Sequence, residues 1–368
     1  MSKPKGATRR MFLGSELVGS VAKLPSRLEF DDDDSERPPQ TPDLGEVARL
    51  ARLAQRGVLD YICIDETLAG NPPFSGRRRG GLDSVRLATR LAPATDGVYL
   101  VPLVHANRVA PSSLLEALIS LEIASSGRHG WELAWQAGAP AQGHGGELLA
   151  AIVEDTWSAA DPLTRLAASA RAFRRQQLDW SRQGGAKGCP PRHPVQVMRA
   201  DAPEAVALAG LRAHLARVAA ASQDDAAAKR AALRAAALEA GRDPDSLRVL
   251  VDLSVTLAGQ PAQAEARKDL AEEITGERLG GDGIRFVGTP AALAQACAEW
   301  VAAEACDGFT FLPTSLPVDL MLLVGGVTPA LAAAGHRPAA YQRGGRRGGP
   351  GRVRPLSGET RRPAASRR

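Results

Sequence analysis

The chain alternates short, unbroken apolar segments with segments in which apolar residues recur at helical spacing. The clearest apolar segments are Leu59–Ile64, Val98–Val104 and Leu247–Leu257. A strand that is apolar at every position, rather than at every second one, is typical of a parallel sheet covered on both faces. Parallel strands need long crossover connections, which are usually helices. This pattern restricts the chain to an α/β architecture.

About eight strand–helix units can be counted, which predicts a (β/α)8 TIM-type barrel. The remaining strands are predicted at Met11–Leu13, Trp131–Trp135, Val195–Met198, Leu215–Ala219 and Gly308–Leu312. Helices are predicted at Leu44–Arg56, Ser84–Leu91, Pro111–Ser125, Pro203–Gly210, Ala226–Ala240, Pro290–Ala303 and Leu320–Ala334. The start of one helix is well marked, because Thr289 supplies a capping hydroxyl and Pro290 suits the first helical position.

One barrel over residues 1–340 is the predicted domain, with an insertion at about 138–194 between the fourth and fifth strands. Long insertions of this kind commonly form lids and substrate-binding loops. The segment 341–368 is rich in Arg, Gly and Pro, and we predict that it is disordered. It holds nine Arg and one Glu, a net charge of +8, so the remaining chain carries −3 although the whole carries +5. The folded part is therefore mildly acidic.

Several classes of site are disfavoured by composition. Four consecutive aspartates, Asp31–Asp34, are interpreted as a solvated loop, because adjacent side chains cannot all turn to one metal ion. None of the four cysteines forms a CxxC pair, and Cys63 and Cys306 lie in or beside apolar segments, so we interpret them as small buried apolar residues. Aromatic residues make up 4% of the chain, which disfavours base-stacking recognition of nucleic acid.

The beginning of the chain allows two interpretations. Thr8-Arg9-Arg10-Met11-Phe12-Leu13 resembles a twin-arginine export signal. The apolar stretch that follows is short and contains Glu16, so we favour Met11–Leu13 as the first strand of a cytoplasmic protein. No segment reaches the length of apolar sequence that spans a membrane.

Several motifs, in order along the chain, resemble the luciferase-like flavin monooxygenases, and within them the nitrilotriacetate, dibenzothiophene-sulfone and pristinamycin monooxygenases. These motifs are Leu121–Trp131 (LEIASSGRHGW), Pro190–Ala202 (PPRHPVQVMRADA), Gly241–Leu247 (GRDPDSL), Val287–Pro290 (VGTP) and Cys306–Pro313. The resemblance covers most of residues 10–340. It implies a barrel that binds reduced FMN, supplied by a separate flavin reductase, and uses it with O2 to oxygenate a small organic substrate. Barrels of this kind commonly form homodimers, so a homodimer is expected. Neither a membrane nor a specific nucleic acid is expected as a partner, because no long apolar segment is present and aromatic residues are few.

The resemblance also suggests functional residues at the carboxyl ends of the strands, where barrel active sites lie. His105 is the candidate catalytic group, as a proton shuttle. The candidates for cofactor binding are Asp65, Asn107, Glu132, His144, Arg199 and Ala202. A structural role remains open for Asp65, as a capping residue, and for His105, as a hydrogen-bonding residue.

The chain departs from the family most strongly at the loop after the fifth strand. Ala202 stands where the family has a serine hydroxyl, Pro203 lacks an N–H, and Asp201 adds a negative charge. Arg199 and the following helix N-terminus would compensate for these losses in holding a phosphate. The alternative hypothesis is a catalytically degenerate barrel that serves as a non-catalytic partner subunit.

Overall fold

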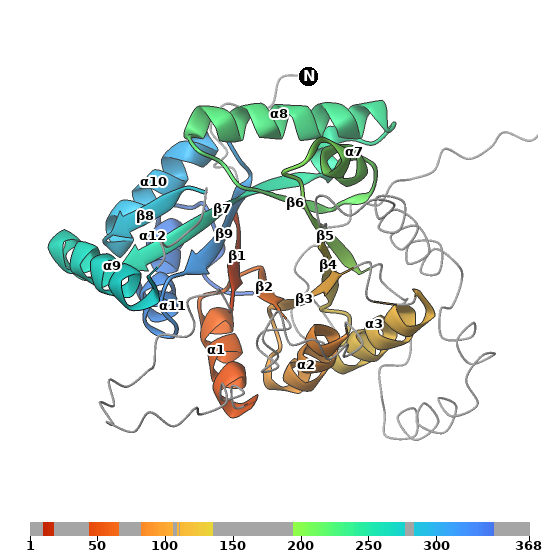
Figure 1. Cartoon of the computed structure of the whole chain (residues 1–368), viewed down its shortest axis with the longest axis horizontal. Helices are drawn as coiled ribbons and strands as arrows, with labels where there is room; N and C mark the ends of the chain where they lie inside the picture. The colour runs from red at the N-terminus through yellow and green to blue at the C-terminus, as the bar shows by residue number, and fades with distance from the viewer. Residues whose placement is uncertain are drawn as a thin grey trace, which may run out of the picture.

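The barrel predicted from the sequence is present. The computed structural model describes residues 10–17, 44–65, 82–105, 109, 111–134, 194–276 and 283–341. Eight parallel strands form a closed ring with helices packed around it (Figure 1). These strands are β1 (Phe12–Glu16), β2 (Tyr61–Ile64), β3 (Tyr99–His105), β4 (Gly130–Ala134), β5 (Val195–Arg199), β6 (Leu215–Val218), β7 (Arg248–Leu257) and β9 (Gly308–Pro313). The fold class predicted from the sequence is thus confirmed.

Strand β7 closes the ring because it is the longest strand and has partners on both edges. Its first half pairs with β6, from Leu215 opposite Arg248 onward, and its middle pairs with β9. The carboxyl half, Ser254–Leu257, pairs in parallel with an additional short strand, β8 (Arg285–Gly288). Strand β8 was not predicted from the sequence, because it is short and begins with the charged Arg285. In the structure, three of its four residues are only partly buried.

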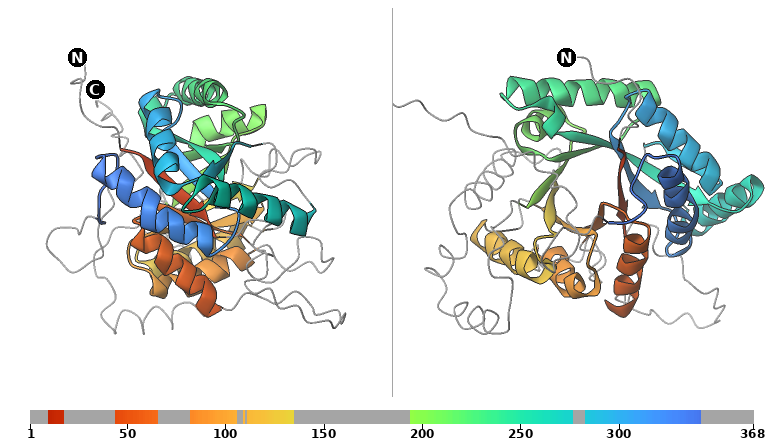
Figure 2. Two further views of the ribbon diagram at one scale, coloured as in Figure 1. Left: turned by 90° about the vertical axis from the view of Figure 1, so that its left-hand side faces the viewer. Right: turned by 180° about the vertical axis from the view of Figure 1, so that it is seen from behind.

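The helices lie outside the strands, as the views from the side and from behind show (Figure 2). They are α1 (Leu44–Arg56), α2 (Asp83–Leu91), α3 (Pro111–Ser125), α7 (Pro203–Arg212), α8 (Gln223–Glu239), α9 (Pro261–Thr275), α10 (Pro290–Ala302), α11 (Val318–Leu322) and α12 (Thr328–Ala333). Helix α9 was not predicted. The predicted helix Leu320–Ala334 is interrupted by a π-helical segment, Leu323–Val327, which contains the glycine pair Gly325-Gly326.

Two apolar clusters divide the strand side chains between the inside and the outside of the ring. The larger one lies between strands and helices and includes Ile62, Leu100, Ala216 and Val251. The smaller one fills the barrel interior with the alternate residues of the same strands: Tyr61, Cys63, Tyr99, Val101, Val195, Val197, Leu215 and Leu250. Because neighbouring residues of a strand point to opposite faces, both sets must be apolar, which explains the unbroken apolar segments.

A buried ion pair joins the two ends of the described chain at the amino-terminal side of the barrel. Asp60, which precedes β2, accepts hydrogen bonds from Arg10 at 2.7 Å, Arg337 at 3.0 Å and the Leu13 N–H at 2.8 Å. Tyr341 donates to the carbonyl of Leu59 at 2.6 Å. The segment that follows α12 therefore belongs structurally to the barrel.

Acidification is expected to destabilise the barrel through His129, which directly precedes β4. Burial lowers the pKa of its imidazole to about 3, whereas a histidine in the unfolded chain titrates near ~6.5. The unfolded chain thus binds a proton that the folded chain excludes, so stability falls as pH drops below ~6.5. We expect a loss of about 2 kcal/mol between pH 7 and pH 5.

Urea unfolding at several pH values measures this loss, and His129→Leu serves as the comparison because it cannot titrate. The difference in unfolding free energy between the two proteins should change across this pH range. Parallel pH profiles for the two proteins would show that His129 does not carry the effect.

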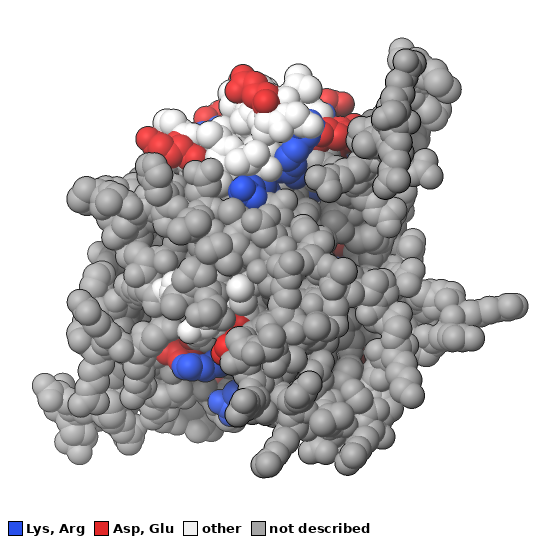
Figure 3. All heavy atoms as spheres, turned by 90° about the vertical axis from the view of Figure 1, so that its right-hand side faces the viewer, with Lys and Arg blue, Asp and Glu red and all other residues white. Residues whose placement is uncertain are grey.

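Among the described residues, no helix is both long enough and apolar enough to cross a bilayer. The described side chains also include no group of three or more His, Cys, Asp or Glu that could hold a metal ion. On the face shown in Figure 3, acidic and basic side chains of the described residues lie near one another.

Candidate active site

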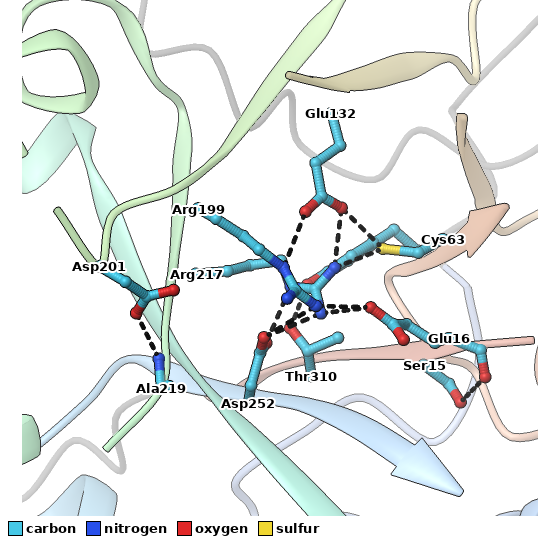
Figure 4. Close-up of polar contacts among 11 residues, drawn as sticks. Ser15, Glu16, Cys63, Glu132, Arg199, Asp201, Arg217, Ala219, Asp252 and Thr310 are labelled. Carbon is cyan, nitrogen blue, oxygen red and sulfur yellow. Dashed lines mark hydrogen bonds and ion pairs between the residues drawn. The ribbon is translucent and has the colours of Figure 1, made fainter. Parts of the chain in front are cut away.

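Five charged side chains from five different strands meet inside the barrel, toward the carboxyl ends of the strands (Figure 4). They are Glu16 at the end of β1, Glu132 on β4, Arg199 at the end of β5, Arg217 on β6 and Asp252 on β7. We call this group the ionic floor. Active sites of (β/α)8 enzymes lie at this end of the barrel, so the ionic floor forms part of the candidate site.

Arg217 is the centre of the ionic floor, and its side chain is only 1% exposed. Its Nε and Nη2 donate to the two carboxylate oxygens of Asp252 at 2.8 and 3.0 Å. Its Nη1 donates to Glu132 Oε2 at 2.7 Å, and its Nη2 also donates to Glu16 Oε1 at 2.6 Å. Three carboxylates therefore share one guanidinium, an arrangement that fixes the orientation of all four side chains.

Arg199 lies over the same carboxylates but is 45% exposed. Its Nη2 lies 3.1 Å from Glu16 Oε1 and 3.4 Å from Asp252 Oδ2, and its Nε lies 3.5 Å from Glu132 Oε1. These contacts are longer than those of Arg217. Arg199 is thus the cation of the ionic floor that a molecule in the barrel mouth can reach.

Burial and charge oppose each other within the ionic floor. Burial by itself lowers the pKa of Arg217, but Asp252, Glu132 and Glu16 raise it, and the pKa stands well above its ordinary value. Burial raises the pKa of Glu16 and outweighs the opposite effect of the two arginines. The guanidinium of Arg217 is thus permanently charged, whereas Glu16 takes up a proton more readily than an exposed glutamate does.

Uncharged groups from β2 and β9 adjoin the ionic floor. The Cys63 thiol donates to Glu132 Oε2 at 3.4 Å, and burial raises the pKa of that thiol well above its ordinary value. The hydroxyls of Tyr61 and Thr310 lie 2.5 Å apart, and burial likewise raises the pKa of Tyr61. Cys63 is therefore an unreactive buried thiol, as the sequence predicted, because the thiolate is the reactive form.

The loop after β5 differs from a simple phosphate cradle. Asp201 Oδ1 accepts the N–H of Ala219 at 2.9 Å, which ties the end of β5 to the end of β6. Ala202 caps α7 without a side-chain hydrogen bond, Pro203 follows, and Glu204 adds a negative charge in the first turn. Backbone N–H groups of that turn remain as anion donors, because the first turn of a helix has no acceptors of its own.

The structure brings two of the predicted site residues together, Glu132 and Arg199, in the ionic floor. Asp65 directly follows β2, His105 is the last residue of β3, and Ala202 precedes α7. All three lie at the carboxyl ends of strands, as predicted. Asn107 and His144 lie outside the described residues.

Sequence reasoning missed Glu16, Arg217 and Asp252 as functional residues. A signal for two of them was present, because Arg217 and Asp252 are charged residues within otherwise apolar strands. A charge in such a position must find an opposite charge inside the fold. Glu16 carried no such signal, since it stands at the end of its strand.

The comparison with known proteins agrees with this architecture. The model of the family described as luciferase-like monooxygenase matches residues 28–284, which is more than two thirds of the chain. The chain belongs to the luciferase-like monooxygenase family. Strands β4, β5, β6 and β7, which carry Glu132, Arg199, Arg217 and Asp252, lie within this match, whereas β1 with Glu16 precedes it.

Individual relatives of this luciferase-like monooxygenase are distant. N-acetyl-S-(2-succino)cysteine monooxygenase of Bacillus subtilis is 39% identical over 75 residues, a match that spans 20% of this chain and 16% of that protein. The EDTA monooxygenase of Chelativorans sp. BNC1 has a similar structure, with a TM-score of 0.67 and 19% identity over 90% of this chain and 96% of that one. A riboflavin lyase, solved with modified FMN and riboflavin, gives a TM-score of 0.65 and 16% identity over 91% and 94% of the two chains. These structures share the fold with this chain.

Proposed function

We propose that this luciferase-like monooxygenase oxygenates a small organic substrate with O2 and reduced FMN, and that a separate flavin reductase supplies the reduced FMN. The observation that carries the proposal is the position of Arg199. Its half-exposed side chain lies at the carboxyl end of a barrel that belongs to the luciferase-like monooxygenase family. The nitrilotriacetate, dibenzothiophene-sulfone and pristinamycin enzymes are the proposed subfamily, and we propose a cytoplasmic homodimer.

The described residues suit the polar edge of a flavin ring, which presents hydrogen-bond acceptors and one N–H. Arg199 offers N–H donors held in place by three carboxylates, and Asp65, directly after β2, offers an acceptor. For the phosphate of FMN, the first turn of α7 offers backbone N–H groups, against the charge of Glu204. When bound, reduced flavin supplies the electrons that activate O2.

The protein's own residues then have distinct proposed roles. Arg217 orients Glu132, and Glu132 in turn contacts Arg199 at the barrel mouth. His105, at the end of β3, remains the proposed proton shuttle, and Ala202 lets the flavin phosphate approach the start of α7. Asn107 and His144 remain proposed flavin contacts.

Anaerobic titration with oxidised FMN, reduced FMN and riboflavin, followed by flavin fluorescence and absorbance, tests the proposal. We expect reduced FMN to bind, and Arg199→Met to weaken that binding by about tenfold or more, because a hydrogen bond from a charged donor contributes roughly 1.5–3 kcal/mol. Arg234→Met, which removes an arginine paired with Asp245 on the outside of the barrel, is the matched control and should bind like the wild type.

The comparison of FMN with riboflavin isolates the phosphate. Weaker binding of riboflavin would mean that the phosphate is held, and equal binding would mean that only the ring is recognised. If no flavin binds in either redox state, the monooxygenase proposal is wrong for this chain, and the non-catalytic partner subunit becomes the better hypothesis.

A further inference from the structure

The ionic floor contains one carboxylate more than it contains guanidiniums. Glu16, Glu132 and Asp252 face Arg199 and Arg217, and within the described part of the chain no other cation is paired with these three carboxylates. The neighbouring Cys63 and Tyr61 cannot supply a positive charge. If all three carboxylates were ionised, the group would therefore carry a net negative charge inside the barrel.

An uncompensated charge in a buried site is costly, and like charges that share one guanidinium repel each other. The least costly way to remove the charge is to protonate one of the carboxylates, as in other pairs of carboxylates that share a site. The geometry then distinguishes among the three.

Asp252 is the least suitable of the three, because both of its oxygens accept hydrogen bonds from Arg217. Glu132 is 1% exposed and contacts both arginines, so a proton reaches it only through the other members of the ionic floor. Glu16 is 18% exposed, and the hydrogen bonds it accepts from the described residues go to Oε1. Oε2 is thus left for a proton, next to the barrel mouth.

We propose that the ionic floor holds one proton in the resting protein and that Glu16 is the residue that carries it and exchanges it with a ligand in the barrel mouth. The ligand in this statement rests on the proposed function. On exchange, the O–H bond of Glu16 breaks, its electron pair stays on the carboxylate, and the proton forms a bond to a heteroatom of the ligand, without any transfer of electrons. Arg217 and Arg199 then stabilise the carboxylate that remains.

The groups that face Glu16 make its protonation sensitive to charge in opposite directions. Arg217 from β6 and Arg199 from β5 favour the ionised form, while Asp252 from β7 and Glu132 from β4 favour the protonated form. The next strands of the ring, β2 and β9, contribute Cys63, Tyr61 and Thr310, which are uncharged. Removing a cation should therefore strengthen proton binding, and removing a carboxylate should weaken it.

The test is a carbon-13 NMR titration of the intact, flavin-free protein labelled at the glutamate carboxyl carbons, with the Glu16 signal assigned by its loss in Glu16→Gln. We expect Glu16 to titrate at a clearly higher pH than a glutamate of the unfolded chain, which titrates near ~4.3. In Arg199→Gln the midpoint should rise, and in Glu132→Gln it should fall, each by about one pH unit or more. Asp245→Asn, at the opposite end of the barrel, should leave the midpoint unchanged.

A Glu16 signal that titrates in the wild type at the pH of a glutamate in the unfolded chain would overturn the proposal. So would midpoints that move in the same direction in both variants, since a purely structural effect has no reason to follow the sign of the removed charge. If a variant does not fold, the wild-type titration alone tests the proposal. Because no flavin is present, the result does not depend on the proposed function. If the protein binds reduced FMN but the titration midpoint of Glu16 is not raised, the proposed proton site is wrong and the proposed function stands.

Discussion

Replacing Arg217 with methionine is expected to destabilise the protein by about 3–5 kcal/mol, a large part of the stability of a typical domain. Methionine is long and flexible enough to fill the space of the arginine stem. The loss arises because Glu132 and Asp252 stay buried with Arg199 as their remaining cation, and Arg199 contacts them at longer distances than Arg217 does. Chemical denaturation followed by circular dichroism measures the change.

Two further variants separate the removal of charge from the loss of packing. Arg199→Met removes the other arginine of the ionic floor, but that side chain is half exposed, so the cost should stay within about 1 kcal/mol. The double variant Arg217→Met/Asp252→Leu removes a cation together with one of its carboxylates and should recover part of the loss. A double variant less stable than Arg217→Met alone would contradict this account.

Replacing Asp60 with asparagine is expected to cost about 3–5 kcal/mol as well, for a related reason at the opposite end of the barrel. Asparagine keeps an oxygen for the Leu13 N–H but removes the charge that faces Arg337, whose side chain is 1% exposed. Arg337 would retain the carbonyls of Met11 and Val58 but would be a buried cation without an anion. The carboxy-terminal segment should detach from the barrel first.

Thermal and urea unfolding measure the loss, and hydrogen exchange of the segment 336–341 shows where it begins. Arg10→Met is the matched control, because Arg10 binds the same carboxylate but is 37% exposed, and its removal should cost less than about 1 kcal/mol. If Asp60→Asn were no more harmful than Arg10→Met, the buried ion pair would not be what holds the segment in place.

The barrel itself could be predicted from the sequence because its physical requirement is local. A strand covered on both sides must be apolar throughout, and this property is visible in segments such as Leu247–Leu257 and Val98–Val104. The predicted helices Leu44–Arg56 and Pro111–Ser125 have the same ends in the structure. The prediction failed where the pattern is weak, as in β8, or where one segment changes its helical type, as at Leu323–Val327.

The candidate site could be predicted only in part. Position at a strand end identified Arg199, the family resemblance identified Glu132 on the fourth strand, and the structure joins the two. The partners of these two residues could not be predicted, because a strand sequence shows which face a side chain occupies but not which side chain lies opposite. The assignments of Asp65, His105 and Ala202 to flavin binding or catalysis remain predictions.

The fold class and the luciferase-like family thus follow from local patterns of residues, and a charge such as Arg217 within an apolar strand is a signal, overlooked at first, that an opposite charge lies nearby. Which residues supply that opposite charge is visible in the folded barrel alone. Ring closure brings Glu16 of β1 to 2.6 Å from Arg217 of β6, 201 residues along the chain, and adds Asp252 and Glu132 from two further strands. The identity of the partners follows from the stagger of the strands around the ring, a global property that no local pattern of residues records.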